Sequence, residues 1–277
     1  MDQQKKTALL DTLVEAFQAD SGAYRDLAVP ADAEGKRQLL RALMNVRPPR
    51  PMDPGTLRLQ DDYLHARAME KGIVPVDAIP TIAQAYDSRH AHADVLSIWQ
   101  GDITRLQCGA IVNAANSEML GCFRPGHTCI DNCIHTYAGV QLRLDCAEQM
   151  ERLRRLHGQD YTQPTAAPML TDGYALPAEK IVHIVGPIVE GTLTPALEAD
   201  LAACYRNTLD LCMEAGLRSV AFCGISTGVF RFPADRAAEI AVQTVTAWLS
   251  EHPGQMERVI FDVHSDETRK RYEALLA

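Results

Sequence analysis

The stretch from Gly101 to Gly139 reads GDITRLQCGAIVNAANSEMLGCFRPGHTCIDNCIHTYAG, and the rest of the chain can be interpreted around it. It opens with Gly-Asp at an expected strand end, and an apolar run follows at Ala110–Val112. Amide, thiol, imidazole and carboxylate groups then occur close together in the sequence, a mixture that predicts a functional site. The candidate residues of this stretch are Asn113, Asn116, Cys122, His127, Cys129 and Asp131.

Beyond residue 90 the chain alternates short apolar runs with longer amphipathic segments, which indicates a mostly parallel sheet with helices on both faces. The predicted strands are 95–99, 110–112, 181–185, 219–223 and 259–263. The predicted helices are 130–150, 195–215, 234–249 and 267–276. In open sheets of this kind ligands bind outside the carboxyl ends of the strands. Polar or glycine-rich loops follow three of these ends, at Gly101-Asp102, Asn113–Asn116 and Gly224–Phe230.

The N-terminal third has a different pattern. Apolar residues at helical spacing predict helices within residues 1–46, and a further helix is expected at 56–70. Four prolines between residues 48 and 54 break the first helical segment. We therefore predict an N-terminal helical region over residues 1–85 and a second domain over residues 86–277.

Composition narrows the possible partners. Hydrophobic residues make up 47% of the 277, enough to bury a large core. The net charge of −9 argues against a general nucleic-acid-binding protein, which needs a basic surface. No apolar run reaches the roughly 18 residues of a membrane span, and the start MDQQKKTALL lacks a signal core. We therefore expect a cytoplasmic protein that binds neither nucleic acid nor membrane, and whose eight cysteines are thiols.

Cys122, His127 and Cys129 have the spacing C-x4-H-x-C in a loop with proline and glycine. Two thiolates and an imidazole suit zinc. Three ligands leave a coordination position open, as in catalytic zinc sites, whereas Cys133 as a fourth ligand would close the site and make it structural. The alternative is that these loop residues bind no metal.

The loop Gly224–Phe230, GISTGVF, leaves a predicted strand and enters a helix near Pro233. Backbone amides at such a position favour a phosphate group. The spacing matches neither a P-loop nor a dinucleotide fingerprint, so a plain tight turn is the alternative.

Together, GDIT, NAAN at Asn113–Asn116, IDNCIHTYAG, VHIVGP at Val182–Pro187 and GISTGVF resemble the macrodomain family. The resemblance covers roughly residues 85–277 and implies a three-layer α/β/α fold that binds ADP-ribose. Many macrodomain hydrolases have a glycine run where this chain has GCFRPGHTC. That departure resembles the zinc-containing, sirtuin-associated macrodomains, which also have a helical N-terminal extension.

The resemblance implies a role for each candidate residue. Asp102 and Ile103 would bind adenine, and Asn113 and Asn116 would lie near the distal ribose, where Asn116 and Asp131 are the candidate catalytic residues. Zinc would lie beside that ribose, held by Cys122, His127 and Cys129. The residues expected to surround the diphosphate and distal ribose are Ser226, Thr227, Gly228, Val229 and Phe230. Alternatively, Asp102 caps a turn, Asn113 ties two loops together and Asp131 caps a helix.

The predicted function is therefore hydrolysis of mono-ADP-ribose from modified proteins, with zinc positioning the ribose or activating water. The alternatives are an ADP-ribose reader with a structural zinc, and an O-acetyl-ADP-ribose deacetylase. The expected partners are ADP-ribose and ADP-ribosylated proteins, among which the resemblance suggests a lipoyl-carrier-type protein.

Overall fold

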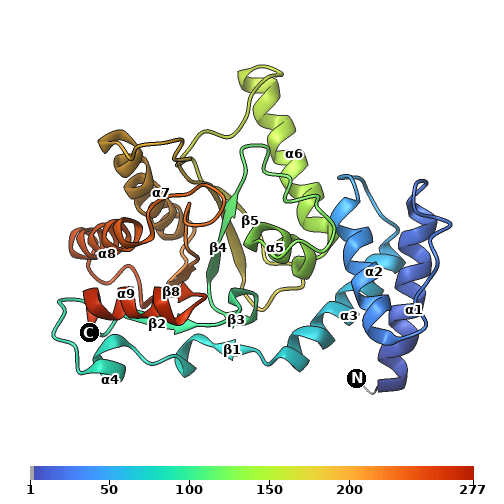
Figure 1. Ribbon diagram of the computed structural model, residues 1–277, viewed down its shortest axis with the longest axis horizontal. Coiled ribbons are helices and arrows are strands. Elements are labelled where there is room, and N and C mark those ends of the chain that lie inside the picture. Colours follow the sequence, from blue (N-terminus) through green and yellow to red (C-terminus); the bar gives the residue numbers. More distant parts are fainter. Residues whose placement is uncertain (1–2) are drawn as a thin grey trace. The chain divides into compact units, whose positions relative to one another are not determined.

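The computed structural model describes residues 3–277, which divide into two compact units (Figure 1). The first, here called the helical unit, combines the described part of Met1–Gly72 with Glu118–Tyr161 and Gly173–Leu176. The second, here called the sheet unit, is made of Ile73–Ser117, Thr162–Asp172 and Pro177–Ala277. The domain boundary near residue 85 stays a prediction.

Five helices form the helical unit: α1 (Gln3–Asp20), α2 (Ala33–Val46), α3 (Pro54–Lys71), α5 (Ile130–Ala138) and α6 (Val140–His157). Asp32 caps α2 by accepting a hydrogen bond from the Gly35 amide at 2.8 Å, and Asp53 caps α3 in the same way through Thr56. The shared core includes Phe17 of α1, Leu43 of α2 and Val140 of α6. The first three helices are therefore packed with α5 and α6 rather than forming a separate bundle.

All strands found within residues 3–277 belong to the sheet unit. They are β1 (Val74–Pro75), β2 (Leu96–Gln100), β3 (Leu106–Gln107), β4 (Ala110–Ala115), β5 (Met169–Asp172), β6 (Lys180–Val185), β7 (Ser219–Phe222) and β8 (Arg258–Val263). β1 and β3 form a small parallel pair, and the main sheet has the order β2-β8-β7-β4-β6-β5. Within it only the β5–β6 pair is antiparallel. The predicted α/β class with a mixed, mostly parallel sheet is confirmed.

The helical segments of the sheet unit are α4 (Ile82–Tyr86), α7 (Pro195–Glu214), α8 (Ala234–Glu251), α9 (Asp266–Leu276) and the 3-10 turns η1 (Val76–Ala78) and η2 (Ile103–Arg105). Their apolar faces and the strands form one core, in which Trp248 and Tyr205 are among the largest buried side chains. Cys204, Cys212 and Cys223 are buried in this unit as free thiols. Among the helices of residues 3–277, none has the length and apolar character that crossing a bilayer requires.

Two predictions about local structure were wrong. The single helix predicted over 130–150 is two helices, because Gly139 has a φ of +96° and ends α5 before α6 begins. The strand Met169–Asp172 was missed because its burial alternates and gives no continuous apolar run.

Candidate functional site

The predicted site residues fall into two groups, one in each unit, and we describe each group by itself. In the helical unit, the ligand atoms of Cys122, His127 and Cys129 all lie within 4.8 Å of one another. All three side chains are half-buried, and the cysteines are free thiols. The residues that the C-x4-H-x-C spacing singles out are thus brought together by the loop Leu120–Cys129, here called the cluster loop.

The geometry of this group fits a tetrahedral ion. With metal–sulfur and metal–nitrogen distances of about 2.3 and 2.1 Å, tetrahedral angles separate the sulfur and nitrogen of a zinc site by about 3.6 Å. The distance between Cys122 Sγ and His127 Nδ1 is 3.6 Å. Within residues 3–277 no fourth histidine, cysteine or carboxylate atom joins the group. The donor set and spacing therefore fit zinc with three protein ligands.

Cys129 also begins helix α5. Its Sγ accepts a hydrogen bond from the Asn132 amide at 3.4 Å, so this thiol, and not Asp131, caps the helix. Burial raises the pKa of the Cys129 thiol to about 12, and the nearby Cys122 thiol adds to the rise, while the Asn132 hydrogen bond opposes it. The thiol is therefore protonated at neutral pH unless a cation displaces the proton, and the helix N-terminus favours the resulting thiolate.

Side-chain amides hold the cluster loop in place. Asn132 Nδ2 donates to the carbonyls of Cys122 and Arg124, at 3.1 and 2.9 Å. Asn45 of α2 accepts from the Gly126 amide at 3.0 Å and donates to Thr136 Oγ1 at 2.8 Å. The loop backbone before His127 is thus fixed by hydrogen bonds that do not use the ligand atoms.

Two arginines complete this framework. Arg41 donates to the His127 carbonyl at 2.7 Å and to Asn132 Oδ1 at 3.0 Å. Arg143 is buried, and it donates to the Leu120 carbonyl at 2.7 Å while its guanidinium lies 4.1 Å from the Phe123 ring centroid. Burial lowers the pKa of Arg143 to about 10, which still leaves it charged at neutral pH.

Arg143 also closes the end of α2. Its Nη1 donates to the carbonyls of Met44, Asn45 and Arg47, at 3.2, 2.8 and 2.6 Å. These are carbonyls of the last turn of α2, which have no partner within the helix. One guanidinium therefore joins the helix end to the cluster loop.

Asp131 is buried in the first turn of α5, and its Oδ1 lies 3.6 Å from His135 Nε2. A buried carboxylate beside an imidazole is suited to accept a proton. Cys133 is half-buried, and its sulfur lies 3.5 Å from Arg41 Nη2. Cys133 is outside the three-residue ligand group.

In the sheet unit, Asn113 is fully buried on β4 opposite His183 of β6. Asn113 Nδ2 lies 3.0 Å from His183 Nδ1, and His183 Nε2 lies 3.0 Å from Thr171 Oγ1. Burial lowers the pKa of His183 to about 3, so the ring is neutral and both distances suit a chain of hydrogen bonds that starts at the Asn113 amide. Asn113 thus ties two strands together, and its sugar contact stays a prediction.

Asn116 follows the end of β4 and is partly exposed. Asp102 caps the η2 turn, with Oδ1 accepting from the Thr104 amide at 3.0 Å, and Ile103 beside it is buried. Oδ1 of Asp102 thus caps a turn, as the alternative interpretation of this residue proposed. The adenine contacts of Asp102 and Ile103 stay predictions. The sequence analysis did not identify a second carboxylate beside Asp102, that of Asp262 on β8. Burial raises the pKa of Asp262 well above its usual value, and the Asp102 charge adds to the rise.

The loop Gly224–Phe230 is organised by its backbone. Ser226 has a φ of +63°, and its carbonyl accepts from the Phe232 amide at 3.0 Å. Thr227, Gly228 and Val229 are exposed, and their amides have no acceptor within the described part of the chain. The buried Ser226 hydroxyl likewise has no partner there. These groups could donate to the oxygens of a diphosphate.

The supporting residues of the cluster loop were also missed by sequence reasoning. Asn45 and Arg41 lie in a helix 81 and 86 residues before the groups they bind, and no local spacing connects them. Asn132 stands inside the quoted stretch, next to Asp131, and only its position at a helix start could have drawn attention to it.

Comparison with known proteins shows which family the chain belongs to. Residues 112–241 match the family model described as Macro domain. The chain is 42% identical over 266 residues to the protein-ADP-ribose hydrolase of Treponema medium, covering 96% of this chain and 97% of that protein. The chain belongs to the macro domain family.

Other macrodomain relatives support this assignment. The protein-ADP-ribose hydrolase of Staphylococcus aureus (strain MRSA252) is 39% identical over 267 residues, which cover 96% of this chain and 94% of that protein. A crystal structure of the Trypanosoma brucei macrodomain in complex with ADP-ribose has a TM-score of 0.63 and 27% identity, covering 84% of this chain and 94% of that one. The macrodomain fold predicted from the sequence is thereby confirmed.

Proposed function

We propose that this macrodomain protein is a zinc-dependent hydrolase that releases mono-ADP-ribose from modified proteins. The observation that carries the proposal is the Cys122, His127 and Cys129 group, whose atoms lie within 4.8 Å and fit three corners of a tetrahedron. The names of the relatives that match 96% of the chain support the reaction class. The GCFRPGHTC loop supports membership of the zinc-containing, sirtuin-associated subgroup, and we assign its action to the cytoplasm.

ADP-ribose would be held by the sheet unit. The exposed amides of Thr227, Gly228 and Val229 would donate to the diphosphate, with the Ser226 hydroxyl as a further donor. Asp102 would accept from the adenine amino group, and Asn116 would hydrogen-bond the distal ribose. This binding would orient the sugar and leave its linkage to the acceptor side chain exposed to water.

Bound zinc would supply a Lewis acid that polarises an oxygen of the sugar or of water. Asp131 would accept the proton of the attacking water, and His135 at 3.6 Å would help to hold that carboxylate. The bond that breaks joins the acceptor side chain to the anomeric carbon, or is an acyl ester on the sugar. Water adds its hydroxyl to one fragment and its proton to the other, so no further reactant is needed.

Three variants test the assignment of roles. Metal content and release of ADP-ribose from an ADP-ribosylated protein would be measured for each, with a lipoyl-carrier-type protein as the first acceptor. We expect Cys129→Ala to lose metal and release together, and Asp131→Asn to keep metal but lose release. Cys133→Ser, which changes a cysteine outside the ligand group, is expected to keep both.

Three results would contradict the proposal. Full turnover by metal-free Cys129→Ala would remove zinc from the mechanism. Tight ADP-ribose binding by the metal-loaded wild-type protein, without release from any modified protein, would make the chain a reader. Cleavage of O-acetyl-ADP-ribose alone would make it a deacetylase.

A further inference from the structure

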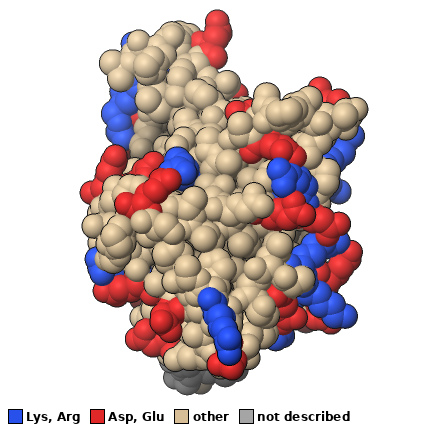
Figure 2. Space-filling view, turned by 90° about the vertical axis from the view of Figure 1, so that its left-hand side faces the viewer, with Lys and Arg blue, Asp and Glu red and all other residues tan. Residues whose placement is uncertain are grey.

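A pocket of about 160 Å³ lies in the helical unit, between α2, α3 and the end of α5. One carboxylate, that of Glu34, lines it against four basic side chains. These are Arg37, Arg41, Arg67 and Lys71, all half-buried. On the face drawn in Figure 2, by contrast, basic and acidic side chains are interspersed. In a chain with a net charge of −9, the pocket is a local concentration of positive charge suited to an anion.

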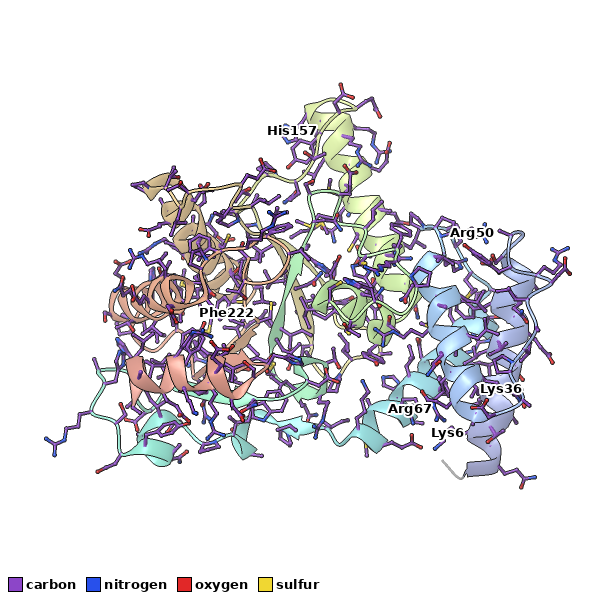
Figure 3. All side chains as sticks on the ribbon, viewed as in Figure 1. Lys6, Lys36, Arg50, Arg67, His157 and Phe222 are labelled. Atoms are coloured by element: carbon purple, nitrogen blue, oxygen red, sulfur yellow. The ribbon has the colours of Figure 1, made fainter. Side chains whose placement is uncertain are left out.

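The four basic residues come as two pairs. Arg37 and Arg41 are one helical turn apart on α2, and Arg67 and Lys71 are one turn apart on α3. Arg67 is labelled on α3 in Figure 3. Like charges at this spacing destabilise a helix, yet both helices direct such a pair at one pocket. A bound anion would relieve that repulsion.

The arginines also retain unused donors. Arg37 bonds Glu34, and Arg67 bonds Glu70, each through a carboxylate three residues away on its own helix. A guanidinium has five N–H donors, so within the described residues several donors of each side chain remain for a ligand. Such donors match carboxylate oxygens in geometry as well as in charge.

Tyr137 of α5 forms part of the pocket wall. Lys71 Nζ lies 3.3 Å from its ring centroid, and the Arg41 guanidinium lies 5.8 Å from it. The ring therefore attracts two cations without neutralising either. The aromatic face therefore helps to hold two of the cations that line the pocket.

We propose that this pocket binds an aspartate or glutamate side chain of the ADP-ribosylated acceptor protein. A pocket of about 160 Å³ is smaller than the roughly 300 Å³ at which pockets for drug-sized ligands begin, which favours a single acidic group over a nucleotide. Arg41 connects the pocket to the proposed site, because the same guanidinium that lines the pocket donates to the His127 carbonyl. An acceptor held there would lie against the cluster loop. This inference rests on the proposed function for the identity of the acceptor.

The test uses the full chain and two fluorescein-labelled decapeptides, one with four glutamates and one with four glutamines at the same positions. Fluorescence anisotropy at low salt would measure their binding to the wild type, to Arg37→Gln/Arg67→Gln and to Arg58→Gln. Arg58 is an exposed α3 residue outside the pocket and serves as the matched control. We expect the wild type and the control to bind the glutamate peptide at least tenfold more tightly than the glutamine peptide, and the double variant to lose this preference.

Calorimetry with ADP-ribose should give unchanged affinity in all three proteins, which shows that the double variant is folded. On an ADP-ribosylated protein, the double variant should raise KM while kcat is retained. The inference is overturned if the wild type does not distinguish the peptides, if Arg58→Gln loses as much as the double variant, or if equimolar inorganic phosphate displaces the glutamate peptide. The peptide measurement needs no turnover, so it separates failure of the pocket from failure of the proposed function.

Discussion

The cluster loop and the loop Gly224–Phe230 are fixed in opposite ways. Side chains from α2, α5 and α6 hydrogen-bond the backbone of the cluster loop, through Asn45, Asn132 and Arg143. The second loop is held by backbone hydrogen bonds, within itself and from the Val189 amide to the Phe230 carbonyl, and leaves consecutive amides exposed. One loop thus has its backbone donors and acceptors used within the protein, and the other keeps its donors for a ligand.

The difference follows from what each loop would bind. A metal needs three side chains held at fixed distances and angles, so the backbone beneath them has to be supported from outside. A diphosphate accepts hydrogen bonds from several directions and needs exposed N–H groups more than rigid side chains. Variants that remove the support of one loop should therefore leave the function of the other intact.

The largest expected effect is that of Arg143→Ala, which removes the support of the cluster loop and of the α2 end together. Four backbone carbonyls lose a charged donor, and three of them are those that close α2. We expect the free energy of unfolding to fall by about 3 kcal/mol or more, as for a broken buried network. Urea denaturation would measure it. Arg152→Ala, an exposed arginine on the same helix, should change it by less than about 0.5 kcal/mol. Equal losses in the two variants would contradict the role of Arg143.

Asn45→Ala should weaken the cluster loop and leave the loop Gly224–Phe230 unchanged. It removes the acceptor of the Gly126 amide beside His127, so we expect zinc affinity to fall by about 10- to 100-fold, as for other residues that support metal ligands. Competition with a chromophoric chelator would measure the zinc affinity, and calorimetry should show ADP-ribose affinity unchanged.

Thr136→Val is the matched control for this prediction. It removes the acceptor of the Asn45 Nδ2 donor and the bond that Thr136 Oγ1 donates to the Asn132 carbonyl within α5. It leaves the Gly126 bond intact, so it should weaken zinc binding less than Asn45→Ala does. If the two variants weaken zinc binding equally, the hydrogen bond to the loop is not what supports the metal site.

The same contrast explains what sequence could predict. The ligand group could be predicted because Cys122, His127 and Cys129 come from one short loop, in which residues close in sequence are also close in space. The main strands were visible as apolar runs, since strands buried on both faces give continuous hydrophobic stretches. The contacts of Asn45 with Gly126 and of Arg143 with the end of α2 could not be predicted, because the groups lie 81 to 99 residues apart and only tertiary packing brings them together.

Some residues were named from sequence, but their surroundings were not. Asn113 was predicted near a sugar, and its buried contact with His183 depends on the β4–β6 register, which no local pattern encodes. Cys133 was named from the sequence as an alternative fourth ligand, because it stands one helical turn after Cys129. Instead, the packing of α2 places Arg41 beside the Cys133 sulfur.

Gly186→Ala tests the second loop. A methyl group there would lie 2.1 Å from Ser226 Oγ and 2.7 Å from Ile225 Cγ2, so the side chains at the start of this loop have to shift. We expect ADP-ribose affinity to fall about tenfold, which corresponds to about 1.4 kcal/mol, with zinc affinity unchanged. Gly22→Ala, where the added carbon meets nothing within 4 Å, is the control for both measurements. Loss of zinc in Gly186→Ala would show that the two loops are not independent.

The smallest effect concerns Asp262, whose raised pKa gives the sheet unit a pH dependence that the cluster loop does not share. A carboxyl with a raised pKa in the folded chain binds more protons folded than unfolded, from about pH 4 up to the raised value. The free energy of unfolding therefore falls as the pH rises through that window. Asp262→Asn cannot ionise but can still accept from the Gly101 amide, so it should remove this fall and stabilise the protein at neutral pH on the order of 1 kcal/mol. Urea denaturation at pH 5 and pH 8 would measure it. Equal pH dependence in the variant and the wild type would show that Asp262 is already ionised at the lower pH, and that burial beside Asp102 does not hold its proton.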